Sequence, residues 1–434
     1  MLSRYFLTFL ALIGLSFGLN GHSDIPNANH IFNAIHSSMR HCGSSVYPNG
    51  MSFYLATVPR GMHFYHGTGT AEPITGLEWL AFEPTHAIGF AHRAERPPSH
   101  HHKREQQVLS NEDPPEHGYL HTYSTAKDLR LLYLDGMSGI KGSGGTMDAQ
   151  DRILFNDSID GELVSRYKKI GGPVDDQQRA IFGCQMAKTD WGGRVDGFIR
   201  TEAGFEIILC NFERDLEVVR IARTKPQTDV QVFGRKSQPP GGDRHMFLSP
   251  FDDLAAQRAR VDFDHLVTAY TYHLDLFAGG SELPRLSHVP THQLDSIKRD
   301  IHDLIMTREP SLNPFDWQAI ADRIVVRYSD KLQALYRTSL SLETLRGQVE
   351  TILEPFIDYD NIDGEEIVQR CRDEFIPRYG TPTGTLAGDV VHYVSGRICS
   401  TLTSVLLQDV DLNRAVENLR DLVSYLAWTT WSGC

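Results

Sequence analysis

The stretch WQAIADRIVVRYSDKLQALY, residues 317–336, decides how the second half of the chain folds. Its apolar residues recur at i, i+3 and i+4 spacing, which is the pattern of an amphipathic helix. The same spacing predicts helices at VDFDHLVTAYTYHLDLF (261–277), HQLDSIKRDIHDLIMT (292–307), LETLRGQVETILEPFI (342–357), GEEIVQRCRDEF (364–375), GDVVHYVSGRICSTLTSVLL (388–407) and LNRAVENLRDLVSYLAW (412–428). Prolines separate these segments and no repeat of fixed period appears, which favours a helical array over a solenoid.

The first half of the chain mixes strands with helices. Apolar runs predict strands at MSFYLATV (51–58), MHFYHGT (62–68), DLRLLYLDG (128–136), RVDGFIR (194–200) and FEIILCNFE (205–213). Helical patterns lie at NHIFNAIHSSMRHC (29–42), EPTHAIGFAHRA (83–94) and DQQRAIFGCQMAKTDW (176–191). We therefore expect an α+β protein, with a mixed α/β domain over residues 19–225, a Pro/Gly-rich linker over 226–260 and a helical domain over 261–434.

Composition and charge exclude several classes of protein. The 434 residues are 41% hydrophobic and 22% charged, which is typical of folded domains and not of disordered chains. The formal net charge of -13 opposes attraction to phosphate backbones and to anionic membranes. We expect no nucleic-acid partner. A protein partner is compatible with the sequence, which does not identify one.

The N-terminus has the pattern of a secretory signal peptide. A single arginine, Arg4, precedes an apolar run from Tyr5 to Leu19, and the small residues Ser16 and Gly18 suit cleavage after residue 18. The run is short for a membrane span, although an uncleaved anchor is the alternative. No other segment is apolar enough to cross a bilayer. The sequence therefore predicts a secreted, extracellular protein without an integral membrane segment after cleavage.

The cysteine count fits an oxidising compartment. Six cysteines without a CxxC pair favour disulfides over a zinc ribbon, and Cys371 with Cys399 is the first pairing we expect. The other pairings stay open. One glycosylation sequon begins at Asn156, so the chain is also a candidate glycoprotein. The basic pair Lys103-Arg104 is either a processing site or an ordinary basic pair on a polar loop.

Several common motifs are absent or incomplete. The turn GSGG (142–145) lacks the GK[ST] ending of a P-loop, and DYDNIDGEE (358–366) fails the EF-hand spacing. Neither GxSxG nor HExxH occurs. The sequence therefore disfavours a P-loop nucleotide site, an EF-hand, an α/β-hydrolase and a zincin. We expect no metal-ligating residues.

Three short segments form a candidate site. His66 and Thr68 stand at the end of the strand HFYHGT, where a ribose hydroxyl could bind and Gly67 would let a ligand approach the backbone. Trp79 or Phe82, in LEWLAF, offers a flat face for stacking. Glu206, at the start of FEIILC, would stabilise an oxocarbenium-like centre. Together these groups suit cleavage of the bond between nicotinamide and ribose.

These segments resemble the histidine–aromatic–glutamate pattern of ADP-ribosyltransferases. The resemblance implies that NAD is a substrate, that His66 and Thr68 hold it, that Trp79 or Phe82 stacks the nicotinamide and that Glu206 is catalytic, with His66 at the same centre. The middle segment has no tyrosine, which departs from the family. The whole chain also resembles a group of secreted fungal proteins without an assigned activity, and this wider likeness implies no mechanism.

Other interpretations of the same residues stay open. HGT is also a common turn, Trp79 and Phe82 are also ordinary core residues, and Glu206 could pair with Arg200. Glu202 is a second acid close to Glu206. The rival function is a secreted binding or effector protein without catalysis, which uses its helical domain. A third is a hydrolase or a hard-cation site built on four acids, Asp135, Asp148, Asp151 and Asp196.

Overall fold

The computed structural model describes residues 25–40, 47–91, 117–141, 144–155, 174–202, 204–225, 258–309, 311, 313–337 and 341–431. Several predictions from the sequence lie outside these ranges: the signal peptide, most of the linker, the sequon at Asn156, the Lys103-Arg104 pair, part of the GSGG turn, Cys42 and Cys434. Within the described ranges a mixed sheet occupies the first half of the chain and helices dominate the second, so the α+β prediction is confirmed.

One sheet contains all the strands of the described residues. The strands are β1 (Asn49–Val58), β2 (His63–Thr68), β3 (Glu78–Ala81), β4 (Tyr119–Thr125), β5 (Leu129–Gly136), β6 (Gly197–Thr201), β7 (Phe205–Leu209), β8 (Leu216–Arg223) and β9 (Arg260–Thr268). Their order across the sheet is β8-β4-β2-β3-β7-β6-β5-β1-β9. Only β5 and β6 are parallel neighbours. The five strands predicted from apolar runs are β1, β2, β5, β6 and β7, and each is confirmed.

Strand β1 lies near the β9 edge and is buried along its whole length. It pairs with β5 on one side and β9 on the other, both antiparallel. Tyr54 of β1 stacks on its cross-strand neighbour Tyr133 with ring centroids 5.7 Å apart. A strand covered on both faces needs an unbroken apolar run, and this requirement explains the sequence MSFYLATV.

The helix predicted over residues 261–277 is wrong. Residues Arg260–Thr268 form the edge strand β9, and only a short 3-10 turn, Ala269–Thr271, follows. Val261, Phe263 and Val267 are buried against the sheet. Apolar residues at these positions fit a strand as well as a helix, and the exposed edge of β1 supplies the hydrogen bonds that select the strand. The sheet therefore continues past residue 261.

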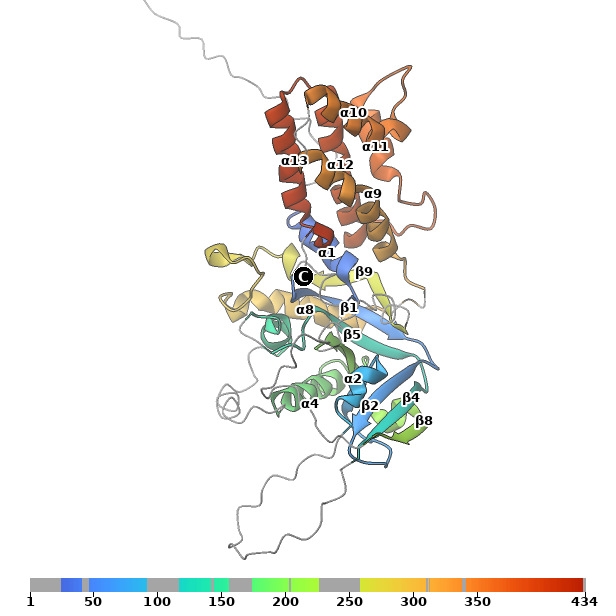
Figure 1. The fold of residues 1–434 in the computed structure, drawn as a ribbon. Coiled ribbons are helices and arrows are strands. Elements are labelled where there is room, and N and C mark those ends of the chain that lie inside the picture. The colour runs from blue at the N-terminus through green and yellow to red at the C-terminus, as the bar shows by residue number, and fades with distance from the viewer. Residues whose placement is uncertain are drawn as a thin grey trace, which may run out of the picture.

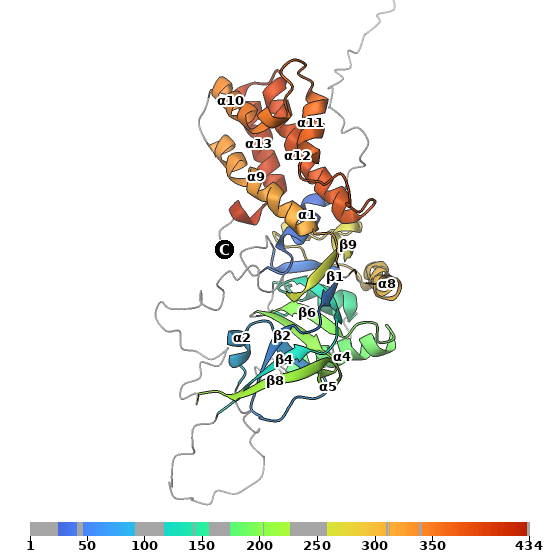
Figure 2. The same ribbon diagram turned by 90° about the vertical axis from the view of Figure 1, so that its right-hand side faces the viewer.

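Helices pack beside the sheet and above its β9 edge (Figures 1 and 2). They are α1 (Ala28–Ser37), α2 (Pro84–Ile88), α4 (Val174–Thr189), α5 (Phe212–Asp215), α8 (Thr291–Thr307), α9 (Trp317–Arg337), α10 (Leu342–Leu353), α11 (Gly364–Asp373), α12 (Leu386–Leu407) and α13 (Leu412–Leu426), with a π-helical segment at Ala149–Leu154. Every helical segment predicted after residue 290 contains an observed helix.

Helix α12 is the centre of the helical region, where it contacts α1, α9, α10, α11 and α13. By length and composition it could span a membrane, which corrects the expectation that only the N-terminal run is apolar enough. Most of its residues are buried inside the fold, however, as in the core helix of a globular protein. The predicted disulfide between Cys371 and Cys399 is confirmed, and it joins α11 to α12. A second disulfide joins Cys184 of α4 to Cys210, directly after β7.

Helix α1 belongs to the helical region although it comes first in the chain. The blue helix lies against the orange and red helices in both views (Figures 1 and 2). The side-chain amides of Asn29 and Asn33 donate to the backbone oxygens of Tyr425 and Leu426, at 2.7 and 2.9 Å. The backbone amide of Met39 donates to the Tyr133 hydroxyl at 3.0 Å. The N-terminal segment therefore ties the helices to the sheet.

Candidate functional site

His66 is held by the fold around it. Its Nδ1 lies 2.7 Å from the backbone oxygen of Trp79, and its ring contacts His121 and Phe212 edge-on, with centroids 6.3 and 5.9 Å away. Burial lowers the pKa of His66 to about 4, and the hydrogen bond to Trp79 opposes only part of that shift. The imidazole is therefore neutral at physiological pH, and one of its nitrogens already has a partner in the fold.

The glycine of the same segment serves helix packing. A Cβ at Gly67 would lie 1.8 Å from the backbone oxygen of Ala87 and 2.9 Å from the amide of Ala91. These atoms belong to α2 and the turn after it, which occupy the space that we predicted for a ligand. Gly67 is thus needed so that α2 can approach β2 closely.

The strand register places His66 and Glu206 on opposite faces of the sheet. Tyr65 of β2 is opposite Ala81 of β3, and Ala81 is opposite Glu206 of β7. Directly paired residues project to the same face, and successive residues along a strand alternate. Glu206 therefore shares a face with Tyr65, whereas His66 projects to the other face beside its own partner, His121.

The remaining residues of the predicted site divide in the same way. Phe82 is 1% exposed and packs edge-on against Phe64 and Phe205, with centroids 5.0 and 6.0 Å away, on the face of His66 and Thr68. Trp79 is opposite Ile208 and shares the face of Glu206. The structure brings His66, Thr68 and Phe82 to one face and Trp79 and Glu206 to the other. These five residues do not surround one ribose.

Glu206 belongs to a group of charges that we call the Arg200 cluster, which consists of Arg200, Glu206, Asp176, Lys141 and Glu202. The first three are buried, whereas Lys141 and Glu202 are partly exposed. Arg200 is fully buried, and its Nε donates to Glu206 at 2.7 Å. Its Nη1 lies 3.5 Å from Asp176, which also pairs with Lys141. Lys141 in turn lies 3.6 Å from Glu202. The pairing of Glu206 with Arg200 that the sequence left open is thus present.

Burial raises the pKa of Glu206, although Arg200 opposes the shift. Burial and the neighbouring Glu206 also raise the pKa of Glu202. Carboxyls of this kind can hold a proton, which is a property of catalytic acids. Glu206 is only 5% exposed, however, and its carboxylate is already paired with Arg200. The cluster has the geometry of a structural ion-pair network.

The four acids of the hydrolase hypothesis lie in separate environments. Asp148 pairs with Arg285, Asp151 with Arg179, and Asp196 with Lys127 and Arg214, whereas Asp135 accepts from the Ser52 amide at 2.8 Å. In the ranges that the structure describes, no group of three or more His, Cys, Asp or Glu side chains is placed to hold a metal ion. These acids therefore do not form one site there.

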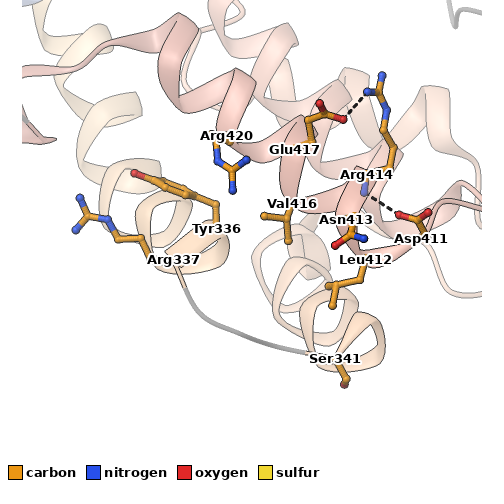
Figure 3. A pocket seen from close by; sticks show the side chains of 10 residues that line it. All are labelled: Tyr336, Arg337, Ser341, Asp411, Leu412, Asn413, Arg414, Val416, Glu417 and Arg420. Atoms are coloured by element: carbon orange, nitrogen blue, oxygen red, sulfur yellow. Dashed lines mark hydrogen bonds and ion pairs between the residues drawn. The ribbon is translucent and has the colours of Figure 1, made fainter.

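One pocket in the described residues, which we call the larger pocket, lies between the end of α9 and the start of α13 (Figure 3). Its volume is about 900 Å³, and its lining residues are Tyr336, Arg337, Ser341, Asp411, Leu412, Asn413, Arg414, Val416, Glu417 and Arg420. The smaller pocket, about 420 Å³, lies where β9 meets α1 and α9. Neither pocket is lined by a residue that the sequence singled out as a site residue.

In the larger pocket, the acidic side chains have hydrogen-bond or ion-pair partners, whereas Arg420 has no ion-pair partner among the described residues. The acids are engaged, because Asp411 caps α13 by accepting from the Arg414 amide at 2.8 Å and Glu417 lies 2.7 Å from the Arg414 guanidinium. Arg337 lies over the ring of Tyr336, with its guanidinium carbon 5.9 Å from the centroid. The guanidinium of Arg420 points into the space between Tyr336 and Val416 (Figure 3). The pocket thus offers cationic groups beside an aromatic ring.

Sequence reasoning missed this pocket because its walls come from helices far apart in the chain. Arg337 ends α9, and Arg420 lies in α13. Each arginine alone has the pattern of a solvated residue on the polar face of an amphipathic helix. The sequence shows only one arginine in each of two helices far apart in the chain, and it is the packing of these helices that brings both arginines to one pocket.

A model of a protein family matches the first half of the chain. Residues 21–116 and 97–235 match the family described as the YPL277C N-terminal domain. Two Saccharomyces cerevisiae (strain ATCC 204508 / S288c) proteins are similar: uncharacterized protein YOR389W is 30% identical over 215 residues, and uncharacterized protein YPL277C is 31% identical over 216 residues. Each match covers 44% of this chain, and 32% and 42% of the respective relatives.

The chain therefore matches less than half the length of these relatives. Neither the family nor the relatives are described as ADP-ribosyltransferases. No solved structure matches the chain. The family match ends at residue 235, before the helical region that contains the larger pocket. The first half of this chain is similar to a fungal family of unknown activity.

Proposed function

We propose that the protein is an exported binding protein whose helical region takes up an anionic ligand in the pocket between α9 and α13. The observation that carries the proposal is Arg420, which points into this pocket and has no ion-pair partner among the described residues. A guanidinium prefers a carboxylate or a phosphate, which it can bind through two parallel hydrogen bonds. The ligand class is therefore a small molecule or short peptide that carries one of these groups.

The rest of the pocket supports this ligand class. The lining contains three arginines, Arg337, Arg414 and Arg420, against two acids, Asp411 and Glu417, so its formal charge is positive. The ring of Tyr336 supplies an apolar surface beside the charges. A volume of about 900 Å³ is in the usual range for small-molecule sites.

Calorimetric titration tests the binding site. The probes are inorganic tripolyphosphate, citrate and oligoglutamate, which separate phosphate from carboxylate and small ligands from peptides. We expect at least one probe to bind, more weakly at higher salt, and Arg420→Gln to weaken it about tenfold or more. The matched control is Arg299→Gln, an exposed arginine of α8 outside the pocket. Equal binding by both variants, or no binding of any probe, would contradict the proposal.

Export is the second part of the proposal. It is supported by the apolar N-terminal run and by two disulfides, which persist in oxidising compartments. The test is to express the chain with its own N-terminus and determine the mass of the protein in the medium. We expect a mature chain that begins at residue 19 with both disulfides formed. Retention of a reduced, uncleaved chain inside the cell would contradict export.

The rival candidate is NAD consumption, which rests on the sequence resemblance and has no support from the strand register. Incubation of the purified protein with NAD, followed by measurement of released nicotinamide, separates the two. A binding protein predicts the same background for the unmodified chain and for Glu206→Gln. Release by the unmodified chain that Glu206→Gln abolishes would favour the transferase instead.

A further inference from the structure

The two edges of the sheet differ. At one end β9 is covered by α8 and α12. At the other end β8 is the outermost strand, far from the helical region (Figure 2). In the described part of the chain no strand pairs with the outer side of β8, which is antiparallel to β4 on its inner side. An edge strand of this kind presents a row of unpaired backbone N–H and C=O groups.

The side chains of β8 are also uncovered. Val218 is 46% exposed and Val219 is 50% exposed, and both neighbours, Glu217 and Arg220, are exposed as well. By contrast, every residue of the interior strands β1, β6 and β7 is buried. Exposed valines on an edge strand favour pairing with another extended segment, because pairing removes their side chains from water.

The edge is cationic in an acidic chain. Arg220 and Arg223 of β8 have no ion-pair partner among the described residues, and Lys225 is exposed just after the strand. The chain as a whole has a formal net charge of -13. An antiparallel pairing of β8 with the β8 of a second copy that is centred between residues 221 and 222 would place Arg220 opposite Arg223, and like charges across a strand pair are destabilising. An acidic segment has the complementary charge.

We propose that the outer edge of β8 binds an extended, acidic peptide segment of another protein by strand addition. Backbone hydrogen bonds supply much of the affinity, as in other strand-addition complexes. Carboxylates of the segment lie near Arg220 and Arg223, and its apolar side chains lie near Val218 and Val219. This surface is separate from the pocket between α9 and α13, so neither site depends on the other.

Fluorescence anisotropy with synthetic peptides tests the proposal. The probe is a labelled peptide of alternating glutamate and valine pairs. One comparison peptide has lysine in place of glutamate. The other is N-methylated at its central residues, so that neither of its edges can donate backbone hydrogen bonds. We expect the acidic peptide to bind in a salt-dependent manner, and each comparison peptide to bind about tenfold or more weakly.

Protein variants give an independent readout. Reversing the charge with Arg220→Glu and Arg223→Glu together should abolish binding of the acidic peptide and create binding of the lysine peptide. Arg299→Glu on α8 is the matched control and should bind the acidic peptide normally. Equal binding of the N-methylated peptide would overturn strand addition. A concentration-dependent dimer that the acidic peptide does not dissociate would overturn the choice of occupant.

Discussion

Replacing Asp135 with asparagine should stabilise the folded chain at alkaline pH and leave its stability in acid nearly unchanged. Asp135 is 7% exposed and accepts a hydrogen bond from the Ser52 amide at 2.8 Å. Burial raises its pKa from 3.8 to about 7, and the hydrogen bonds from β1 oppose only part of the shift. The phenols of Tyr54 and Tyr133 also lie near this carboxyl.

The sign and magnitude follow from linkage. The folded state holds a proton on Asp135 between pH 3.8 and about 7, where the unfolded state has lost it. Stability therefore falls as the pH rises through this window and stays low above it. A difference of about 3 pKa units corresponds to about 4 kcal/mol. Asparagine keeps an oxygen for the Ser52 amide and carries no charge, so Asp135→Asn removes this loss.

The assay is urea unfolding of both proteins at about pH 4.5, 6 and 8, followed by circular dichroism. We expect the free energy of unfolding of Asp135→Asn to exceed that of the unmodified chain by about 3–4 kcal/mol at about pH 8, and by much less at about pH 4.5. The matched control is Asp295→Asn, because Asp295 is exposed on α8. A difference between the two proteins that does not change with pH would refute the reasoning.

Three further predictions concern other buried groups. Arg200→Met leaves Glu206 buried and unpaired, and should cost about 3–5 kcal/mol of unfolding free energy, whereas joint replacement of both by apolar residues should restore much of it; equal losses would contradict this. Replacing Cys371 and Cys399 together by alanine opens a loop with a sequence separation of 28 residues and should lower stability by about 3–4 kcal/mol in chemical unfolding; an unchanged midpoint would count against it. Burial lowers the pKa of His66 to about 4, so the free energy of unfolding should fall as the pH drops from 6.5 towards 4. His66→Gln should reduce this dependence of stability on pH. The same dependence in both proteins would contradict the lowered pKa.

The sequence predicted much of the fold because its patterns are local. The unbroken apolar run of β1 and the helical spacing of α9 each indicate one element without reference to the rest of the chain. The pairing of Cys371 with Cys399 followed from their places in neighbouring helices. The prediction over residues 261–277 was wrong because the pairing of β9 with β1 overrides its helical spacing. That pairing joins segments about 200 residues apart, and no local pattern contains it.

The candidate site depended on information that a sequence does not contain locally. Whether His66 and Glu206 share a face is set by the register of β2, β3 and β7, and a shift of one residue in any strand reverses the answer. The role of Gly67 likewise depends on where α2 packs. Arg420 has an ordinary surface pattern in the sequence, and its direction into a pocket follows only from the packing of α9 against α13.

Hydrogen–deuterium exchange with and without tripolyphosphate tests most directly whether the binding site lies in the helical region. We predict that the ligand slows exchange of backbone amides at the start of α13, around Asn413 and Arg414, and at the end of α9, near Tyr336, and that Arg420→Gln removes the effect. Protection confined to β2 and β7, around His66 and Glu206, would place the site on the sheet and contradict the proposed function.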